Sequence, residues 1–291
     1  MQADRPSRTA EYMALFRAVE TAARPARRLF ADPYAPALLT GKLKVLAAVA
    51  RVPFAGRLAT WLLDIGWPRT RSSAVIRTRL IDDWVRDTIR GGARQLLILG
   101  AGFDSRPYRL PEAAAIPVFE VDHPATQNAK RSRLAQAPPS VRFVPVDFEK
   151  DDLEASVRRS GFDSAVPAIA IWEGVVSYLT ASAVDQNLRM LARILAPASR
   201  LIFSYVHRGA LDGSVTFPEA RRWKSSVGSA GEPFIFGFDP VELPGYLGAR
   251  GFVLRNDVST ADAAITYNQL LHRREPGSAL YRIALAERRV L

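Results

Sequence analysis

The sequence predicts an α/β fold: a mostly parallel, twisted sheet with helices on both faces, an antiparallel C-terminal edge and a helical N-terminal extension. Two observations lead to this prediction. In the middle of the chain, five short apolar runs of strand length alternate with stretches that can form crossover helices. Nearer the C-terminus, two strand-like runs lack a clear crossover helix between them, and such a pair commonly forms an antiparallel edge.

The first 94 residues are expected to be helical. In residues 9–19 apolar side chains recur at helical spacing, and Pro25 interrupts the pattern soon afterwards. Ser72-Ser73 is a candidate cap for a second helix that ends at Gly91-Gly92. The apolar stretch 43–65 contains four charged residues, so it falls short of the ~20 apolar residues of a membrane span and is predicted to form soluble helices.

Each central run has the length of one buried strand, and glycine, proline or charged residues bound it. The predicted elements are strands at 95–99, 117–122, 141–147, 168–173 and 200–205, crossover helices at 125–135 and 183–195, and the C-terminal pair of strands at 251–254 and 279–285.

We expect one domain with four parts. Residues 1–94 form the helical extension that covers the core, and residues 95–206 form the ligand-binding core. Residues 207–240 combine glycine, serine, proline and aromatic residues with weak periodicity, which is typical of a lid-like insertion. Residues 241–291 complete the edge of the sheet.

Composition excludes several classes of protein. The chain has 291 residues, of which 48% are apolar and 24% charged, so disorder and collagen-like structure are excluded. It has no cysteine, which excludes disulfides, thiolate metal sites and a cysteine nucleophile, and no metal-ligand spacing occurs elsewhere. Residues 1–7 lack the apolar core of a secretory signal, and we expect a cytoplasmic protein.

The net charge of +11 raises the question of a nucleic-acid partner. Residues 41–94 hold eleven basic and four acidic residues, whereas residues 95–200 hold twelve of each. The arginines are scattered and few aromatics interleave with them, which disfavours a nucleic-acid surface. We therefore expect neither a nucleic-acid nor a membrane partner, and interpret the excess as attracting an anionic small molecule.

Glycines and acids stand at the carboxyl ends of the first four predicted strands, where open α/β sheets bind their ligands. Asp122 follows Gly102 by twenty residues, the spacing at which an acid binds ribose hydroxyls. The pattern predicts a ligand that contains a nucleoside. The residues are Gly100, Gly102, Glu120, Asp122, Asp147 and Glu173.

The same residues distinguish between two cofactors. A dinucleotide fingerprint places a third glycine where this chain has Ser105, and the acids suit a ligand without phosphate. S-adenosylmethionine has ribose, adenine and a sulfonium but no phosphate, so it is favoured over NAD. An NAD-dependent oxidoreductase and a non-catalytic, arginine-rich nucleic-acid binder remain the alternatives.

Five motifs resemble the leucine carboxyl methyltransferase family, a branch of the class I S-adenosylmethionine-dependent methyltransferases that includes polyketide O-methyltransferases. The resemblance covers residues 9–205 and implies a Rossmann-like fold with S-adenosylmethionine as cofactor. The motifs are FADPY at 30–34, RTRLIDD at 77–83, GAGFDSRPYRL at 100–110, FEVDHP at 119–124 and EGVVSYLT at 173–180.

The resemblance also implies roles for individual residues in holding the cofactor. Gly100 and Gly102 would line its methionine and ribose part. Asp122 would bind the ribose hydroxyls, with Glu120 as the alternative. Asp147 would accept a hydrogen bond from the adenine amino group.

Further roles concern the adenine ring and the amino-acid end of the cofactor. Phe148 would lie against the adenine. Arg77 would pair with the carboxylate, Glu173 would lie near the amino group, and Arg17 is the candidate for a further basic contact. Each has a structural alternative: Arg77 could pair with an acid on its own helix, Asp82 or Asp83, and Glu173 could cap the following helix.

The acceptor decides whether the enzyme needs a general base. A carboxylate is already ionised at neutral pH, so orientation and exclusion of water suffice. A phenol or alcohol needs a base, for which Tyr178 and His207 are the candidates, although Tyr178 could instead be a core aromatic. We expect an O-methyltransferase that acts on a carboxylate or hydroxyl of a small, polyketide-like molecule.

Overall fold

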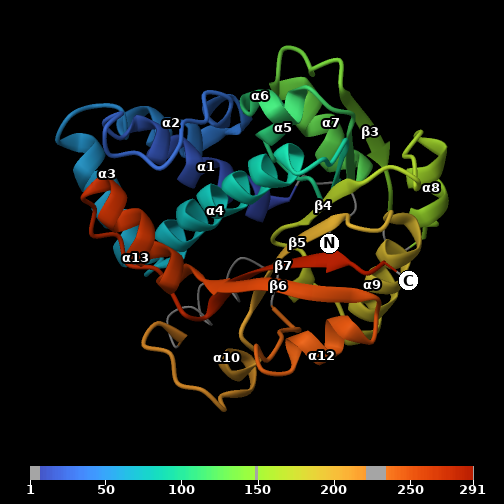
Figure 1. Cartoon of the computed structure of the whole chain (residues 1–291). Coiled ribbons are helices and arrows are strands. Elements are labelled where there is room, and N and C mark those ends of the chain that lie inside the picture. The colour runs from blue at the N-terminus through green and yellow to red at the C-terminus, as the bar shows by residue number, and fades with distance from the viewer. Residues whose placement is uncertain (1–6, 148–149, 221–233, 291) are drawn as a thin grey trace.

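The computed structural model describes residues 7–147, 150–220 and 234–290. Its described part contains a seven-stranded sheet in the order β3-β2-β1-β4-β5-β7-β6 (Figure 1). The five strands β1 to β5 are parallel, and β7 is antiparallel to both of its neighbours, β5 and β6. The strands are β1 (Gln95–Leu99), β2 (Val118–Asp122), β3 (Val141–Pro145), β4 (Ala168–Trp172), β5 (Arg200–Val206), β6 (Phe252–Ser259) and β7 (Tyr281–Arg288). The predicted fold class is confirmed.

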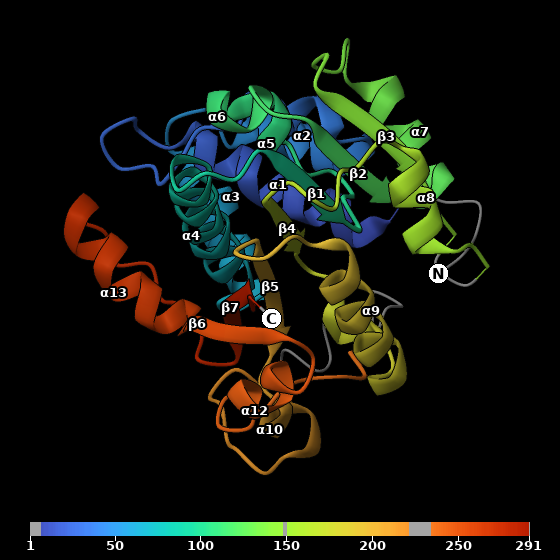
Figure 2. The same cartoon turned by 45° about the vertical axis from the view of Figure 1, so that its right-hand side comes forward.

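The sheet separates two apolar layers because successive strand residues point to opposite faces. In β1, Leu97 and Leu99 belong to a core that α8, α9 and α12 cover, and Leu96 and Ile98 belong to a core under α1, α4, α6 and α13. Figures 1 and 2 show α4 and α9 on opposite sides of the strands. These helices are α1 (Arg8–Ala22), α4 (Thr70–Arg90), α6 (Pro111–Ala114), α8 (Leu153–Arg159), α9 (Ala181–Ile194), α12 (Leu243–Gly248) and α13 (Thr260–Leu271).

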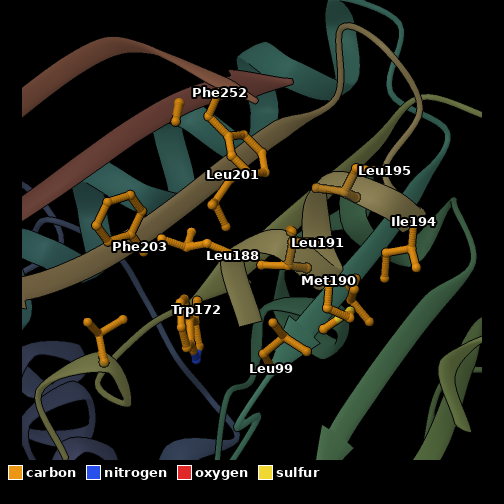
Figure 3. Close-up of a cluster of buried hydrophobic side chains, with 14 of the residues drawn as sticks. Leu99, Trp172, Leu188, Met190, Leu191, Ile194, Leu195, Leu201, Phe203 and Phe252 are labelled. Atoms are coloured by element: carbon orange, nitrogen blue, oxygen red, sulfur yellow. The ribbon is translucent and has the colours of Figure 1, made fainter. Parts of the chain in front are cut away.

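The core on the α9 side is centred on Trp172, which is 2% exposed. Leu188 and Leu191 of α9 approach it from the helix, and Phe203 lies beside it on the neighbouring strand (Figure 3). Because α9 has Val184, Leu188, Leu191 and Ile194 at helical spacing, its whole inner face is apolar, as the predicted crossover helix requires.

Two sequence expectations about helices were wrong. The first expectation was that Ser72-Ser73 caps a helix. Instead, α4 begins at Thr70, after Arg69, so both serines lie inside it and cap nothing. Both serines are buried, and Ser73 accepts a hydrogen bond from Thr260, the first residue of α13. A polar contact between helices, 187 residues apart in sequence, was therefore misread as a local capping signal.

The second expectation was that no clear helix lies between the two C-terminal strands. Instead, the helix α13 joins β6 to β7. Its N-terminus carries a recognisable cap, because the Ser259 side chain accepts from Asp262 N. The buried face, however, consists mainly of Ala263, Ala264 and Tyr267, which give a weak apolar pattern. The predicted antiparallel edge is nevertheless confirmed.

The remaining elements surround these layers, and within the described ranges no helix is both long and apolar enough to span a bilayer. Of the expected insertion 207–240, residues 221–233 lie outside the described residues. The elements are η1 (Ala35–Leu38), α2 (Gly41–Val49), α3 (Ala55–Gly66), α5 (Arg106–Arg109), α7 (Pro124–Arg133), η2 (Val176–Tyr178) and α10 (Arg208–Asp212).

Candidate cofactor site

Three neighbouring strands bring the predicted site residues to one edge of the sheet. β1 lies between β2 and β4, with Leu99 opposite Val121 and Ile98 opposite Ile171. The carboxyl ends of these strands therefore lie side by side. They carry Asp122, the last residue of β2, together with the glycines at 100 and 102 after β1 and Glu173 after β4.

Asp122 contacts the glycine-rich loop directly. Its Oδ2 accepts a hydrogen bond from Gly102 N and its Oδ1 accepts one from His123 N. Burial raises the pKa of Asp122, and these two backbone donors act in the opposite direction. Each carboxylate oxygen retains a second lone pair, so Asp122 can still accept from a diol.

Gly100 has a backbone conformation that favours glycine, with φ of +63°. A Cβ there would lie 2.4 Å from Cγ2 of Val175, in the turn after β4. The loop after β1 and the turn after β4 therefore approach each other as closely as a residue without a side chain allows.

Glu173 lies between two arginines. Arg77 Nε donates to Oε1 at 2.7 Å and Arg106 Nη1 donates to Oε2 at 2.8 Å. Burial alone raises the pKa of Glu173, but Arg106 and Arg77 outweigh it and lower the pKa to about 2. Glu173 is therefore ionised at neutral pH.

These contacts decide the structural alternatives. Arg77 pairs with Glu173 across 96 residues of sequence, not with Asp82 or Asp83 on its own helix. The helix that follows Glu173 has no side-chain cap, so the capping alternative for Glu173 is wrong. Arg77 and Glu173 instead form one pair at the edge of the sheet.

The sequence reasoning missed Arg106, which joins this pair to the interior. Its guanidinium donates to Asp82, Asp104 and Glu173, and its side chain is only 3% exposed. Asp82, which is fully buried, also accepts two hydrogen bonds from Arg109. The available signal was the pair of arginines three residues apart in the motif after β1.

Asp32 links the N-terminal segment to the same loop. It accepts from Arg17 Nε at 2.8 Å and from Ser105 Oγ at 2.6 Å, while its Oδ1 receives backbone N–H groups at the start of η1. Arg17 also donates to the carbonyl of Phe103 and contributes to lowering the pKa of Glu173. The candidate basic contact at Arg17 thus lies against the glycine-rich loop.

Glu120 is engaged elsewhere. Its Oε2 accepts from Lys130 Nζ at 2.7 Å, and Lys130 also donates to the carbonyl of Asp104. Burial raises the pKa of Glu120 to about 7, and the attraction to Lys130 opposes this rise. Because Glu120 is buried and paired with Lys130, which also binds the carbonyl of Asp104 in the loop after β1, Asp122 is the better candidate for binding the ribose.

The predicted adenine contacts lie at the end of β3. Asp147 Oδ2 accepts from Lys150 Nζ at 2.9 Å, and the Asp147 side chain is 22% exposed. Phe148 lies outside the described residues. The Arg77–Glu173 pair and the Gly102–Asp122 hydrogen bond therefore lie at neighbouring strand ends, and Asp147 follows β3, whose Pro145 is opposite Asp122.

The two candidate bases have partners of their own. The Tyr178 ring packs on Phe234, with ring centroids 4.8 Å apart. His207 Nδ1 accepts from Gly209 N at 3.0 Å and so caps α10, and burial lowers the pKa of His207. A neutral His207 therefore carries its proton on Nε2 and offers no lone pair there.

The donor set fits a nucleoside that bears an amino acid. Asp122 supplies acceptors for a diol, Arg77 a cation for a carboxylate, and Glu173 an anion for an ammonium group. Asp122 and Glu173 would repel a phosphate. The set matches S-adenosylmethionine better than a dinucleotide.

Comparison with known proteins identifies the family. The sequence profile described as "Leucine carboxyl methyltransferase" matches residues 10–192. A provisionally named S-adenosyl-L-methionine-dependent methyltransferase from Mycobacterium sp. strain JLS is 33% identical over 287 residues, covering 88% of this chain and 86% of that protein. A relative with the same name from Mycobacterium tuberculosis is 38% identical over 194 residues, covering 62% of this chain and 60% of that protein.

A solved structure supports the fold. A provisionally named methyltransferase from Thermobifida fusca aligns with a TM-score of 0.62 at 20% identity, over 99% of this chain and 97% of that one. The oxidoreductase and nucleic-acid-binder alternatives are therefore set aside, and the resemblance drawn from the five motifs is confirmed. The chain belongs to the leucine carboxyl methyltransferase family of S-adenosylmethionine-dependent methyltransferases.

Proposed function

We propose that this chain is an O-methyltransferase for a small, anionic, polyketide-like molecule, with a carboxylate as the favoured acceptor. The observation that carries the proposal is the joint placement of Asp122 and the Arg77–Glu173 pair at the edge of the sheet. S-adenosylmethionine, when bound there, supplies a methyl group activated by its sulfonium.

The residues of the chain would hold the cofactor at three points. Asp122, whose carboxylate is already held by a hydrogen bond from Gly102 N, accepts hydrogen bonds from the ribose hydroxyls. Arg77 donates to the carboxylate of the methionine part, and Glu173 accepts from its ammonium group. Because Arg106 keeps its own contact with Glu173, that carboxylate stays ionised when Arg77 turns to the ligand.

The state of His207 favours a carboxylate acceptor. Its Nδ1 lone pair is used by Gly209 N, so proton abstraction needs a change of tautomer or a broken helix cap. A carboxylate needs no base, and the enzyme then contributes orientation and exclusion of water. The helical extension up to residue 94 and the described residues that follow 206 would border the acceptor pocket of a single domain.

A labelling experiment tests this proposal. Incubation with methyl-labelled S-adenosylmethionine and a panel of hydrophobic carboxylic acids and phenols should yield a labelled product that mild alkali hydrolyses, as a methyl ester does. His207→Asn, which keeps an N-cap, should retain activity within severalfold. An alkali-stable labelled ether that disappears with His207→Asn would contradict the carboxylate acceptor.

A further inference from the structure

The helices α2 and α3 form a hairpin, residues 41–66, that is named here the α2–α3 hairpin. It packs mainly on α1, η1 and α4, and Figure 1 shows it at the outer edge of the molecule. Large apolar side chains are exposed along it, among them Val45 on α2 and Phe54 at the turn, which is 80% exposed. Phe54 has a φ of +65°, which is rare for a bulky residue.

The apolar exposure on α3 is organised as a stripe, named here the outer stripe. Leu58, Trp61, Leu62 and Ile65 follow the helical spacing of a single face and are 49% to 58% exposed. The opposite face of the helix is already buried, with Leu63 only 4% exposed. The outer stripe therefore exceeds what α3 needs for packing against its own protein.

An open groove continues this surface between the two helices. It has a volume of about 420 Å³ and apolar residues line it, including Leu46 and Val49 of α2 and Leu58 and Leu62 of α3. The exposed apolar residues of the hairpin therefore form one continuous surface that contains a groove, and they are not scattered single residues.

The charges of the hairpin are mostly positive. Residues 41–66 contain four basic residues, Lys42, Lys44, Arg51 and Arg57, and one acid, Asp64, which pairs with Arg71 of α4. All four basic residues are exposed, and none forms an ion pair with any residue that the structure describes. By contrast, arginines elsewhere in the chain, such as Arg71 and Arg106, pair with two or more acids.

We propose that the α2–α3 hairpin docks the protein on an anionic phospholipid surface. Apolar residues that include tryptophan and phenylalanine, combined with lysine and arginine, are the composition of helices that lie in the membrane interface. The outer stripe and Phe54 enter the headgroup region, and the four cations contact lipid phosphates at its rim. Attachment of this kind needs no spanning helix, and it would overturn the expectation that the protein has no membrane partner.

Charge and apolarity together disfavour other occupants. A second copy of the chain docked face to face would place two uncompensated clusters of four cations against each other. A nucleic acid would leave the outer stripe in contact with phosphate and water, without burying it. An anionic bilayer satisfies both the cations and the apolar side chains.

Vesicle co-sedimentation tests the proposal. The full chain should bind vesicles of phosphatidylcholine mixed with phosphatidylglycerol, more weakly at high salt, and should not bind phosphatidylcholine alone. Leu58→Ser with Leu62→Ser should abolish binding, and replacing each basic residue by glutamine should weaken it about fivefold. The matched control, Ile265→Ser with Leu270→Ser on α13, alters equally exposed residues and should bind as the unaltered chain does.

Three results would overturn the proposal. The first is that the unaltered chain does not bind anionic vesicles, or that the double variant Leu58→Ser with Leu62→Ser (the stripe variant) binds them equally well. The second is a dimer in solution that the stripe variant dissociates without any vesicle binding, which makes a second copy the occupant. The third is a raised KM for the acceptor in the stripe variant with vesicle binding unchanged, which makes the groove an acceptor site.

Tryptophan fluorescence gives an independent readout. Binding to vesicles should shift the tryptophan emission to the blue, and Trp61→Phe should lose this shift.

Discussion

The candidate cofactor site and the α2–α3 hairpin differ in how their charged residues are paired. At the site, Glu173 meets Arg77 and Arg106, Asp82 meets Arg106 and Arg109, and these side chains are at most 17% exposed. The hairpin has four exposed cations and an exposed apolar stripe, and none of these cations has an acidic partner among the described residues.

The difference separates two kinds of evidence for function. Buried charges are tolerated only when partners compensate for lost hydration, so the paired network shows a site whose geometry is fixed in advance. Exposed apolar residues and unpaired cations need no internal partner, and such a surface indicates a partner outside the chain. The predictions below test each half of this contrast.

The largest effect is expected for Asp82→Asn. The substitution leaves Arg106 and Arg109 buried without their common anion, and breaking a buried pair costs about 3–5 kcal/mol. Denaturant unfolding measures the loss. The control is Asp87→Asn on the same helix, whose pair with Arg90 is exposed and should change stability by less than about 0.5 kcal/mol. If Asp82→Asn lowered the free energy of unfolding as little as Asp87→Asn, the buried network would not be important for stability.

The next effect concerns pH. Because Arg106 and Arg77 lower the pKa of Glu173 to about 2, below the value of 4.5 for a free side chain, its ionised form stabilises the fold. That contribution is complete above about pH 4.5 and is lost as the pH falls toward 2. It amounts to at most about 3 kcal/mol. Unfolding free energies between pH 5 and pH 3 should fall more steeply for the unaltered chain than for Glu173→Gln, and parallel slopes would contradict the pairing.

A pair of glycines tests the loop after β1. Gly100 and Gly41 both have positive φ, but only at Gly100 would a Cβ meet a neighbour. Both alanine variants should lose about 1–2 kcal/mol from the backbone conformation. Gly100→Ala should lose more, and should also weaken cofactor binding, because Val175 must move. If Gly41→Ala weakens cofactor binding equally, the close approach of the two turns has no role in binding.

The smallest effect is expected on the outer stripe. Leu62→Ser should leave the free energy of unfolding within about 0.5 kcal/mol, because Leu62 is 55% exposed. Its neighbour Leu63 is buried, and Leu63→Ala should cost about 2–5 kcal/mol. Thermal unfolding of both variants without lipid measures this. A large loss for Leu62→Ser would mean that the stripe serves folding and not a partner.

The sequence predicted the strands well because each is a short apolar run with clear boundaries. The five central strands begin within one residue of the predicted positions. The helix α13 was missed because its buried face, mainly alanine, gives a weak apolar pattern, and the start of α4 was missed because Ser73 contacts Thr260 of a helix distant in sequence. Local periodicity cannot report such contacts.

For the site, the motifs identified the strand-end residues but not how they are joined. Asp122 and Gly102 were linked by their spacing, and the structure has a hydrogen bond between them. The part played by Arg106 was missed because two of its three acidic partners, Asp82 and Glu173, lie 24 residues before it and 67 residues after it. The charge excess of the N-terminal extension was counted correctly, although only the structure reveals that four of those cations are exposed on the same hairpin as an apolar stripe.

Calorimetric titration with S-adenosylmethionine tests the central claim most directly. The unaltered chain should bind one equivalent, and Asp122→Ala should weaken binding at least about tenfold, because a charged acceptor for the ribose is lost. The control Asp87→Ala removes an exposed acid and should bind normally. Undiminished binding by Asp122→Ala, or no binding by the unaltered chain, would contradict the assignment of the cofactor site to this edge of the sheet.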